Sequence, residues 1–148
     1  MLRNLLFGLS TMAVCLIFEA LLLAVALRYY ARHKELVDSP SLWSSLRVIS
    51  GVMILVVIAN ITQVAMWALL FRALNEFPRF STAFYHSAVN FSTLGYGDIV
   101  MSEKHRLLGP LEAINGVLMI GVSTAALMAV FQDAMKKTLH ARGRTELP

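Results

Sequence analysis

The stretch Phe91-Ser92-Thr93-Leu94-Gly95-Tyr96-Gly97-Asp98 is short, polar and rich in glycine, and it lies between apolar runs long enough to cross a bilayer. Non-helical backbone at membrane depth is costly for each unpaired polar group, unless it is buried in protein or lines a watery path. Gly95 and Gly97 adopt positive φ at little steric cost, so the carbonyls of alternate residues need not point to opposite sides. Four such strands around an axis would form stacked rings of oxygens, which suit a dehydrated monovalent cation.

Within this stretch, Thr93-Leu94-Gly95-Tyr96-Gly97-Asp98 resembles the selectivity filter of potassium channels. A bare Gly-Tyr-Gly is weak evidence because Gly-x-Gly turns are common, but the threonine before it and the aspartate after it make the match specific. The resemblance implies a filter at residues 93–97. The K+ ions would be bound by the main-chain carbonyls of Thr93, Leu94, Gly95 and Tyr96, with the Thr93 hydroxyl closing the inner site.

The resemblance also implies roles for residues around the filter. Asp98 would sit at the outer mouth, where it would concentrate cations and accept a hydrogen bond, with Tyr85 as the candidate donor. The residues that support the filter would be Tyr85, His86, Val89 and Ser92. Tyr85 and His86 stand where the family often has a tryptophan pair, and Val89 stands where some members carry a glutamate. Because His86 has no second ligand at metal spacing, we interpret it as a packed, hydrogen-bonded histidine.

The composition is that of a membrane protein. Of the 148 residues, 57% are hydrophobic and 15% are charged, and the mean hydropathy is +0.66. The length allows one compact unit. The net charge of +4 comes from short basic clusters, which fit topology signals better than nucleic-acid binding. A single cysteine, Cys15, rules out a disulfide within the chain.

Residues 1–45 are predicted to hold an N-terminal membrane helix, at 5–27, and a cytoplasmic connector. We expect the helix to be retained, since its apolar core is too long for a signal peptide and lacks a small-residue cleavage site. Glu19 lies near mid-span, where ionisable groups usually face protein. It is either a proton-sensitive gating residue or a packing residue, protonated or hydrogen-bonded to Asn60 or Gln63 of the next span. We favour the packing interpretation.

Residues 46–135 are predicted to form the pore domain. It would contain an outer helix at 47–72, a pore helix at 80–92, the filter, and an inner helix at 107–131. The pore helix would be roughly 20 Å long, too short to cross, so it is expected to re-enter the membrane with its C-terminal end, at Ser92, directed at the pore axis. In the inner helix, Gly121 and Gly116 are rival positions for a gating hinge. Glu112 is interpreted as an anchor near the outer surface.

The basic residues predict the orientation. Arg28, Arg32, Lys34 and Arg47 form one cluster, and the tail at 136–148 carries another, so both are expected on the cytoplasmic side. Three spans then leave the N-terminus outside the cell and the C-terminus in the cytoplasm. The membrane is expected to be the plasma (inner) membrane. The tail either binds anionic lipid, at about 1 kcal/mol for each basic residue, or is simply solvated.

The sequence therefore predicts an all-α membrane protein with three transmembrane helices, a re-entrant pore helix and an extended filter. By resemblance it would be a potassium-selective channel subunit that conducts passively as a homotetramer. Neither a catalytic residue nor a cofactor other than bound K+ is expected, and membrane lipids would be its further partners.

One alternative comes from another class of protein. Gly95-Tyr96-Gly97-Asp98 also fits the Gly-x-Gly-Asp pattern of intramembrane aspartyl proteases, in which two carboxyls share a proton. Here Asp38 and Asp133 fall outside the predicted spans, and Glu19, an acid near the middle of one, is a glutamate, which is not the partner that this family uses. Asp98 also follows a helix too short to span. The sequence thus favours the filter over the protease.

Overall fold

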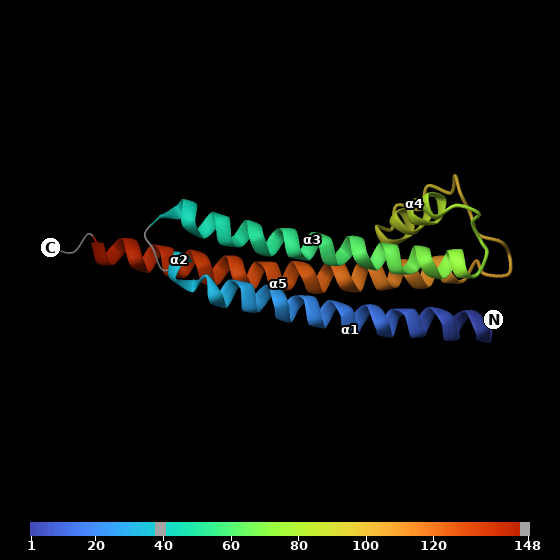
Figure 1. Ribbon diagram of the computed structural model, residues 1–148, viewed down its shortest axis with the longest axis horizontal. Coiled ribbons are helices and arrows are strands. Elements are labelled where there is room, and N and C mark those ends of the chain that lie inside the picture. Colours follow the sequence, from blue (N-terminus) through green and yellow to red (C-terminus); the bar gives the residue numbers. More distant parts are fainter. Residues whose placement is uncertain (38–40, 146–148) are drawn as a thin grey trace. The chain divides into compact units, whose positions relative to one another are not determined.

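The structure is a computed structural model that describes residues 1–37 and 41–145, with side chains up to residue 141. This part of the chain is helical, with elements α1 (Leu2–Arg32), α2 (Lys34–Val37), α3 (Leu42–Ala73), α4 (Phe80–Phe91) and α5 (Leu108–Thr145) (Figure 1). Three of them, α1, α3 and α5, are long and apolar enough to cross a membrane. The predicted fold class is therefore confirmed.

Each long helix extends beyond its predicted range. The first helix was expected at 5–27, the outer helix at 47–72 and the inner helix at 107–131, whereas α1, α3 and α5 have 31, 32 and 38 residues. Backbone hydrogen bonds continue a helix into polar sequence until a breaker or cap ends it, so hydropathy marks the apolar part only. Residues 38–40 of the connector and 146–148 of the tail lie outside the described residues.

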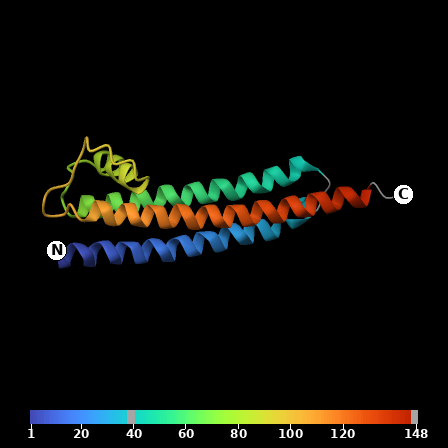
Figure 2. The same ribbon diagram turned by 180° about the vertical axis from the view of Figure 1, so that it is seen from behind.

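The chain divides into two compact units, and the filter stretch lies in the first. Unit 1 comprises Met1–Glu19 and Ala59–Gly121, and unit 2 comprises Ala20–Ile58 and Val122–Pro148. The core of unit 1 is built on buried aromatic side chains, with Trp67 and Phe71 fully enclosed and Phe77 beside them. Within this unit α4 lies against the neighbouring part of α3, as the two opposite views show (Figure 2).

Unit 2 combines an apolar core with polar contacts between helices. Its core includes Val48 and Val52 of α3 and Ala134 of α5. The Tyr30 hydroxyl donates a hydrogen bond of 2.7 Å to the Asp133 carboxylate. These contacts join the parts of α1, α3 and α5 that belong to this unit.

The end of α3 is a helix cap of the Schellman type. The Asn75 amide donates to the Arg72 carbonyl at 3.1 Å, and the Glu76 amide donates to the Phe71 carbonyl at 3.0 Å. Asn75 has φ +59°, the left-handed conformation that this cap needs at its first residue beyond the helix. Asparagine tolerates that conformation well. The cap turns the chain from α3 into the loop that leads to α4.

Candidate ion-conducting site

The C-terminus of α4 holds the start of the predicted filter, residues 93–97, through a second Schellman cap. Ser92 ends the helix with φ −81° and ψ 0°. The Thr93 amide then donates to the Asn90 carbonyl at 2.8 Å, and the Leu94 amide donates to the Val89 carbonyl at 3.0 Å. The carbonyls that an α-helix leaves unpaired at its end therefore anchor the first two residues of the filter.

The filter backbone has a left-handed conformation at every second residue. The φ angles of Thr93, Gly95 and Gly97 are +61°, +58° and +74°. The sequence predicted this conformation for the two glycines and missed it at Thr93. A β-branched residue at positive φ is a strained outlier, costing on the order of 1–3 kcal/mol.

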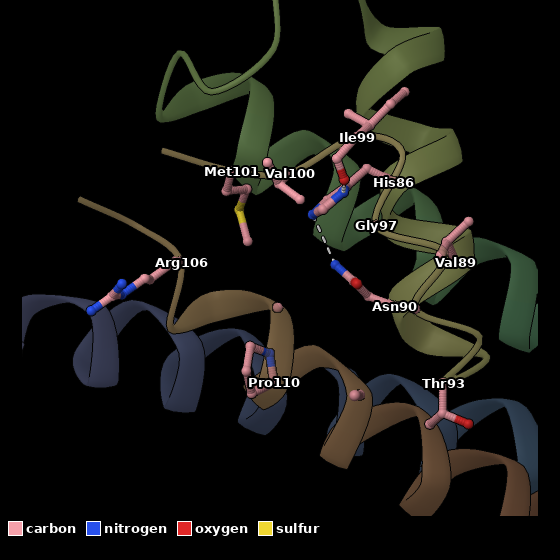
Figure 3. A pocket seen from close by; sticks show the side chains of 13 residues that line it. His86, Val89, Asn90, Thr93, Gly97, Ile99, Val100, Met101, Arg106 and Pro110 are labelled. Carbon is pink, nitrogen blue, oxygen red and sulfur yellow. Dashed lines mark hydrogen bonds between the residues drawn. The ribbon is translucent and has the colours of Figure 1, made fainter. Parts of the chain in front are cut away.

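The filter stretch is exposed in the single chain. Residues 92–98 are all exposed, and the Tyr96 side chain retains 66% of its accessible surface. Behind the stretch lies a pocket of about 410 Å³, lined by residues of α4, the predicted filter, the segment at 99–106 and the start of α5 (Figure 3). Within the single chain, Gly95 and Gly97 have no heavy atom within 4 Å of an added Cβ, so here backbone conformation restricts substitution and contacts do not.

Two hydrogen bonds tie α4 to the strand that follows the filter. The Tyr85 hydroxyl donates to the Asp98 carboxylate at 2.8 Å, which is the bond expected from the sequence. This hydrogen bond to an anion raises the pKa of Tyr85. The His86 ring, one residue on, contacts the Ile99 carbonyl through Nδ1 at 3.0 Å (Figure 3). The outer end of the filter is thus held by consecutive residues of α4.

The contacts of His86 define its tautomer. Nδ1 faces a carbonyl, which only accepts, so Nδ1 carries a proton. Nε2 lies 2.9 Å from the Asn90 side-chain nitrogen, which donates to it when the Asn90 amide oxygen is turned away. His86 is therefore neutral, buried and hydrogen-bonded on both sides. It packs against the rings of Phe71 and Phe77, with centroids 5.6 Å and 4.9 Å away.

A carboxylate clamp joins the loop after α3 to the loop between the filter and α5. Glu76 accepts hydrogen bonds of 2.7 Å from both the amide and the hydroxyl of Ser102, and a further one from Nδ1 of His105. Burial alone would raise the pKa of Glu76. The hydrogen bonds from Ser102 and His105 outweigh it and hold the pKa below its ordinary value.

The two glycines proposed as hinges have different surroundings. A Cβ on Gly116 would collide with the Phe91 carbonyl, so α5 approaches the last residue of α4 closely at this point. Nothing lies within 4 Å of a Cβ on Gly121. Gly121 is also the last residue of unit 1 on α5. Close packing accounts for Gly116, whereas no packing requirement accounts for Gly121.

The remaining site residues predicted from the sequence lie at the end of α4 and in α1. Val89 is buried in α4, and the Ser92 hydroxyl donates back to the Ala88 carbonyl at 2.7 Å. Glu19 is buried in α1 and accepts a hydrogen bond of 2.7 Å from the Gln63 side chain, which is one of the two partners expected for it. In the part of the chain that the structure describes, no group of three or more His, Cys, Asp and Glu side chains could hold a metal ion.

Sequence reasoning missed a polar contact behind the filter. Ser87 of α4 is fully buried, and its hydroxyl contacts both the Glu112 side chain of α5 and the Val64 carbonyl of α3. Glu112 is fully buried too, so its interpretation as an anchor near the outer surface missed this contact. The signal was present: Ser87 and Asn90, like Glu112 and Asn115, are polar residues three apart on apolar helices, hence on one face.

These features define a membrane protein with three apolar helices and a short helix that delivers a non-helical, glycine-rich strand. A family model described as an ion channel matches residues 52–133, more than half of the chain. The chain belongs to this ion channel family, of the two-transmembrane potassium channel type. Comparison with curated proteins and with solved structures gave no match.

The family match bears on the alternative function as well. It covers α4, the filter stretch and most of α5, and it gives no support to an aspartyl protease. Asp98, the residue on which a protease would depend, accepts a hydrogen bond from the Tyr85 hydroxyl. The chain is therefore an ion channel subunit, and the protease interpretation is set aside.

Proposed function

We propose that the chain is the subunit of a potassium-selective channel that assembles as a homotetramer. K+ would bind to the main-chain carbonyls of Thr93, Leu94, Gly95 and Tyr96, with Gly97 completing the filter. The observation that supports this most is the alternation of left-handed residues at positions 93, 95 and 97. Alternation turns successive carbonyls to the same side of a strand, which lets rings of oxygens replace the hydration shell of the ion.

The helix that precedes the filter supports the same function. The C-terminal end of α4 carries a partial negative charge and leads directly into the proposed ion sites, so it favours a cation there. Asp98 adds a formal negative charge at the proposed outer mouth. Conduction would be passive, without catalytic chemistry and with no cofactor other than the ions in transit.

A homotetramer follows from the supply of ligands. One chain contributes one carbonyl to each ring, and four are needed to surround an ion. The exposure of residues 92–98 in the single chain fits a segment that is covered only on assembly. The Tyr96 side chain, two-thirds exposed in one chain, would then pack against a neighbouring subunit.

The orientation that we propose has the N-terminus outside the cell and the C-terminus in the cytoplasm, with the protein in the plasma (inner) membrane. Basic residues near the C-terminal end of α1, near the start of α3 and in α5 after residue 135 support it. This arrangement lets α4 enter the membrane from outside. The same basic residues of α5 are candidates for contact with anionic lipid.

Gating involves residues distant from the filter. Gly121 is our candidate for the hinge in α5, because an added Cβ there meets no atom within 4 Å and packing therefore does not account for the glycine. Gly116 is less suited, since it packs on the end of α4. Glu19 is proposed as a packing residue rather than a pH sensor, in view of its bond to Gln63. Unchanged pH dependence of the current in Glu19→Gln would support that assignment.

Recording from the purified full-length protein in a planar bilayer tests this function. We expect current that reverses close to the potassium equilibrium potential in mixed K+ and Na+ solutions and that is blocked by barium. Chemical cross-linking of the reconstituted protein should give a tetramer as the largest species. Equal permeability to K+ and Na+, or a current that does not require the filter sequence, would contradict the proposal.

A further inference from the structure

The buried carboxyl of Glu112 and the Ser87 hydroxyl must together supply the protons for two oxygen–oxygen contacts. The Ser87 hydroxyl lies 2.7 Å from the Val64 carbonyl and in close contact with Oε1 of Glu112. A hydroxyl has one proton to donate, and a carbonyl has none. If Glu112 were ionised, one of these two short oxygen–oxygen contacts would have no proton between its atoms. Both become hydrogen bonds only if Glu112 supplies a second proton.

The surroundings of Glu112 point the same way. The side chain is completely buried, and within the described part of the chain its Oε2 has no hydrogen-bond partner. An ionised carboxylate with an unpaired oxygen in an apolar interior is very costly, whereas a neutral carboxylic acid tolerates it. Glu112 takes no part in the ion pairs of the described residues, and the polar groups near it, the Asn90 amide and the Cys15 thiol, carry no positive charge.

We propose that Glu112 is a positioning residue for the filter that acts as a neutral acid. Its Oε1 carries a proton and donates it in a hydrogen bond to Ser87 Oγ, and the Ser87 hydroxyl donates in turn to the Val64 carbonyl. This relay joins α5, α4 and α3 side by side. The inference rests on the proposed function, because its consequence for ions depends on residues 93–97 being the filter.

The relay reaches the filter through a short stretch of α4. Val89 and Asn90, two and three residues after Ser87, supply the carbonyls of the Schellman cap that holds the amides of Leu94 and Thr93. Fixing the position of Ser87 therefore fixes the height and rotation of the helix end from which the filter emerges. Gly116, one turn after Glu112, lets α5 approach the same helix end.

Infrared spectroscopy of the full-length protein in lipid tests the proton directly. We expect the carboxylic-acid carbonyl band, recorded at neutral pH, to lose a component in Glu112→Gln. Glu103→Gln is the matched control, because Glu103 is an exposed acid paired with Arg106 and should not contribute to that band. An unchanged band in Glu112→Gln would overturn the proposal. Glu19→Gln identifies any contribution from Glu19, which is buried as well.

Single-channel recording tests the role of the relay. Ser87→Ala and Glu112→Leu should each lower the ratio of conducting to non-conducting time by about tenfold, the effect of one buried hydrogen bond. Glu112→Gln should retain the wild-type ratio, since its amide N–H donates to Ser87 as the acid does. If Glu112→Gln fails as badly as Glu112→Leu, a charge is required and the proposal is wrong.

The two arms separate this inference from the function on which it rests. If the wild-type protein does not conduct K+, the proposed function fails, yet the infrared comparison still decides whether Glu112 is neutral. If K+ current is selective but the band is unchanged in Glu112→Gln, the function stands and the relay falls. Assembly of each variant is checked by cross-linking before either measurement.

Discussion

The ends of α3 and α4 have the same hydrogen-bond pattern but carry different residues at the same position. Each helix closes with a Schellman cap whose first residue beyond the helix has positive φ, +59° at Asn75 and +61° at Thr93. Asparagine adopts this conformation readily, and a β-branched threonine does so only under strain. The cap of α3 thus has the residue that stability favours, whereas the cap of α4 does not.

The difference shows that the chain tolerates backbone strain at position 93 and avoids it at position 75. Position 93 is the one at which a side-chain hydroxyl would face the innermost ion site, and no such demand applies at position 75. Strain in a backbone persists only where the surrounding structure holds it and is concentrated at functional sites. The strained threonine therefore supports the functional role that we propose for the α4 cap, whereas the relaxed asparagine of the α3 cap needs only a structural explanation.

The largest effect should come from the last left-handed residue of the filter. Gly97 has φ +74°, and alanine at that angle costs roughly 1–2 kcal/mol in each subunit of the proposed tetramer. We expect Gly97→Ala to lose K+ conduction or K+ selectivity in bilayer recordings. Space within the chain is not the reason, since an added Cβ meets no atom of the same chain within 4 Å. Full potassium selectivity in this variant would show that the left-handed conformation at position 97 is not required, and the case for accepted strain in this segment would be lost.

Exchanging the capping residues themselves sharpens the contrast. Thr93→Gly should relieve strain, so the assembled protein should melt no lower than wild type, while selectivity for K+ over Na+ falls at least about tenfold with loss of the hydroxyl from four subunits. Thr93→Ser keeps the hydroxyl and should keep selectivity. Asn75→Gly is the matched control at the other cap, with a change of a few tenths of a kcal/mol and unaltered selectivity.

The sequence predicted some of these features and not others. The positive φ at Gly95 and Gly97 follows from residue type, because glycine at alternate positions has few other uses. The positive φ at Thr93 could not be predicted, since threonine disfavours it and only the helix end before it imposes it. The bond between Tyr85 and Asp98 was predicted from the resemblance. The contact between Ser87 and Glu112 depends on the packing of two helices, which one sequence does not specify.

The close approach of α5 to the α4 cap provides a test of intermediate size. A Cβ at Gly116 would collide with the carbonyl of Phe91, the last residue of α4. We expect Gly116→Ala to destabilise the protein by about 1–3 kcal/mol, the usual cost of overpacking, and to reduce conduction through displacement of α4. The measurements are the melting temperature and the K+ current.

Gly121→Ala is the matched control on the same helix. Its Cβ enters open space, so better helix propensity should stabilise the protein by roughly 0.5–1 kcal/mol. If Gly121 serves as the hinge, the same variant should change opening without changing selectivity. Equal destabilisation by the two alanines would mean that the approach of α5 to Phe91 is not tight.

The smallest effect on conduction should come from Glu76 at the α3 cap, which anchors the outer loop and does not contact the proposed filter. Glu76→Gln removes a charged acceptor of three hydrogen bonds, and we expect it to cost about 1–2 kcal/mol at neutral pH. Because the folded protein lowers the pKa of Glu76, this stabilisation is complete above the ordinary value of 4.5 and is lost as the pH falls through the lowered value. The melting temperatures of wild type and Glu76→Gln should therefore differ at pH 7 and converge in acid.

Glu103→Gln controls for the loss of a carboxylate from the same outer loop, since Glu103 is exposed and its pair with Arg106 is worth little. Selectivity should be unchanged in both variants, because neither touches the α4 cap or the filter. A loss of selectivity in Glu76→Gln would show that the loop clamp, and not the cap at Thr93 alone, holds the filter in its conducting form. If the melting temperatures of wild type and Glu76→Gln still differ in acid, the charge of Glu76 is not what stabilises the loop.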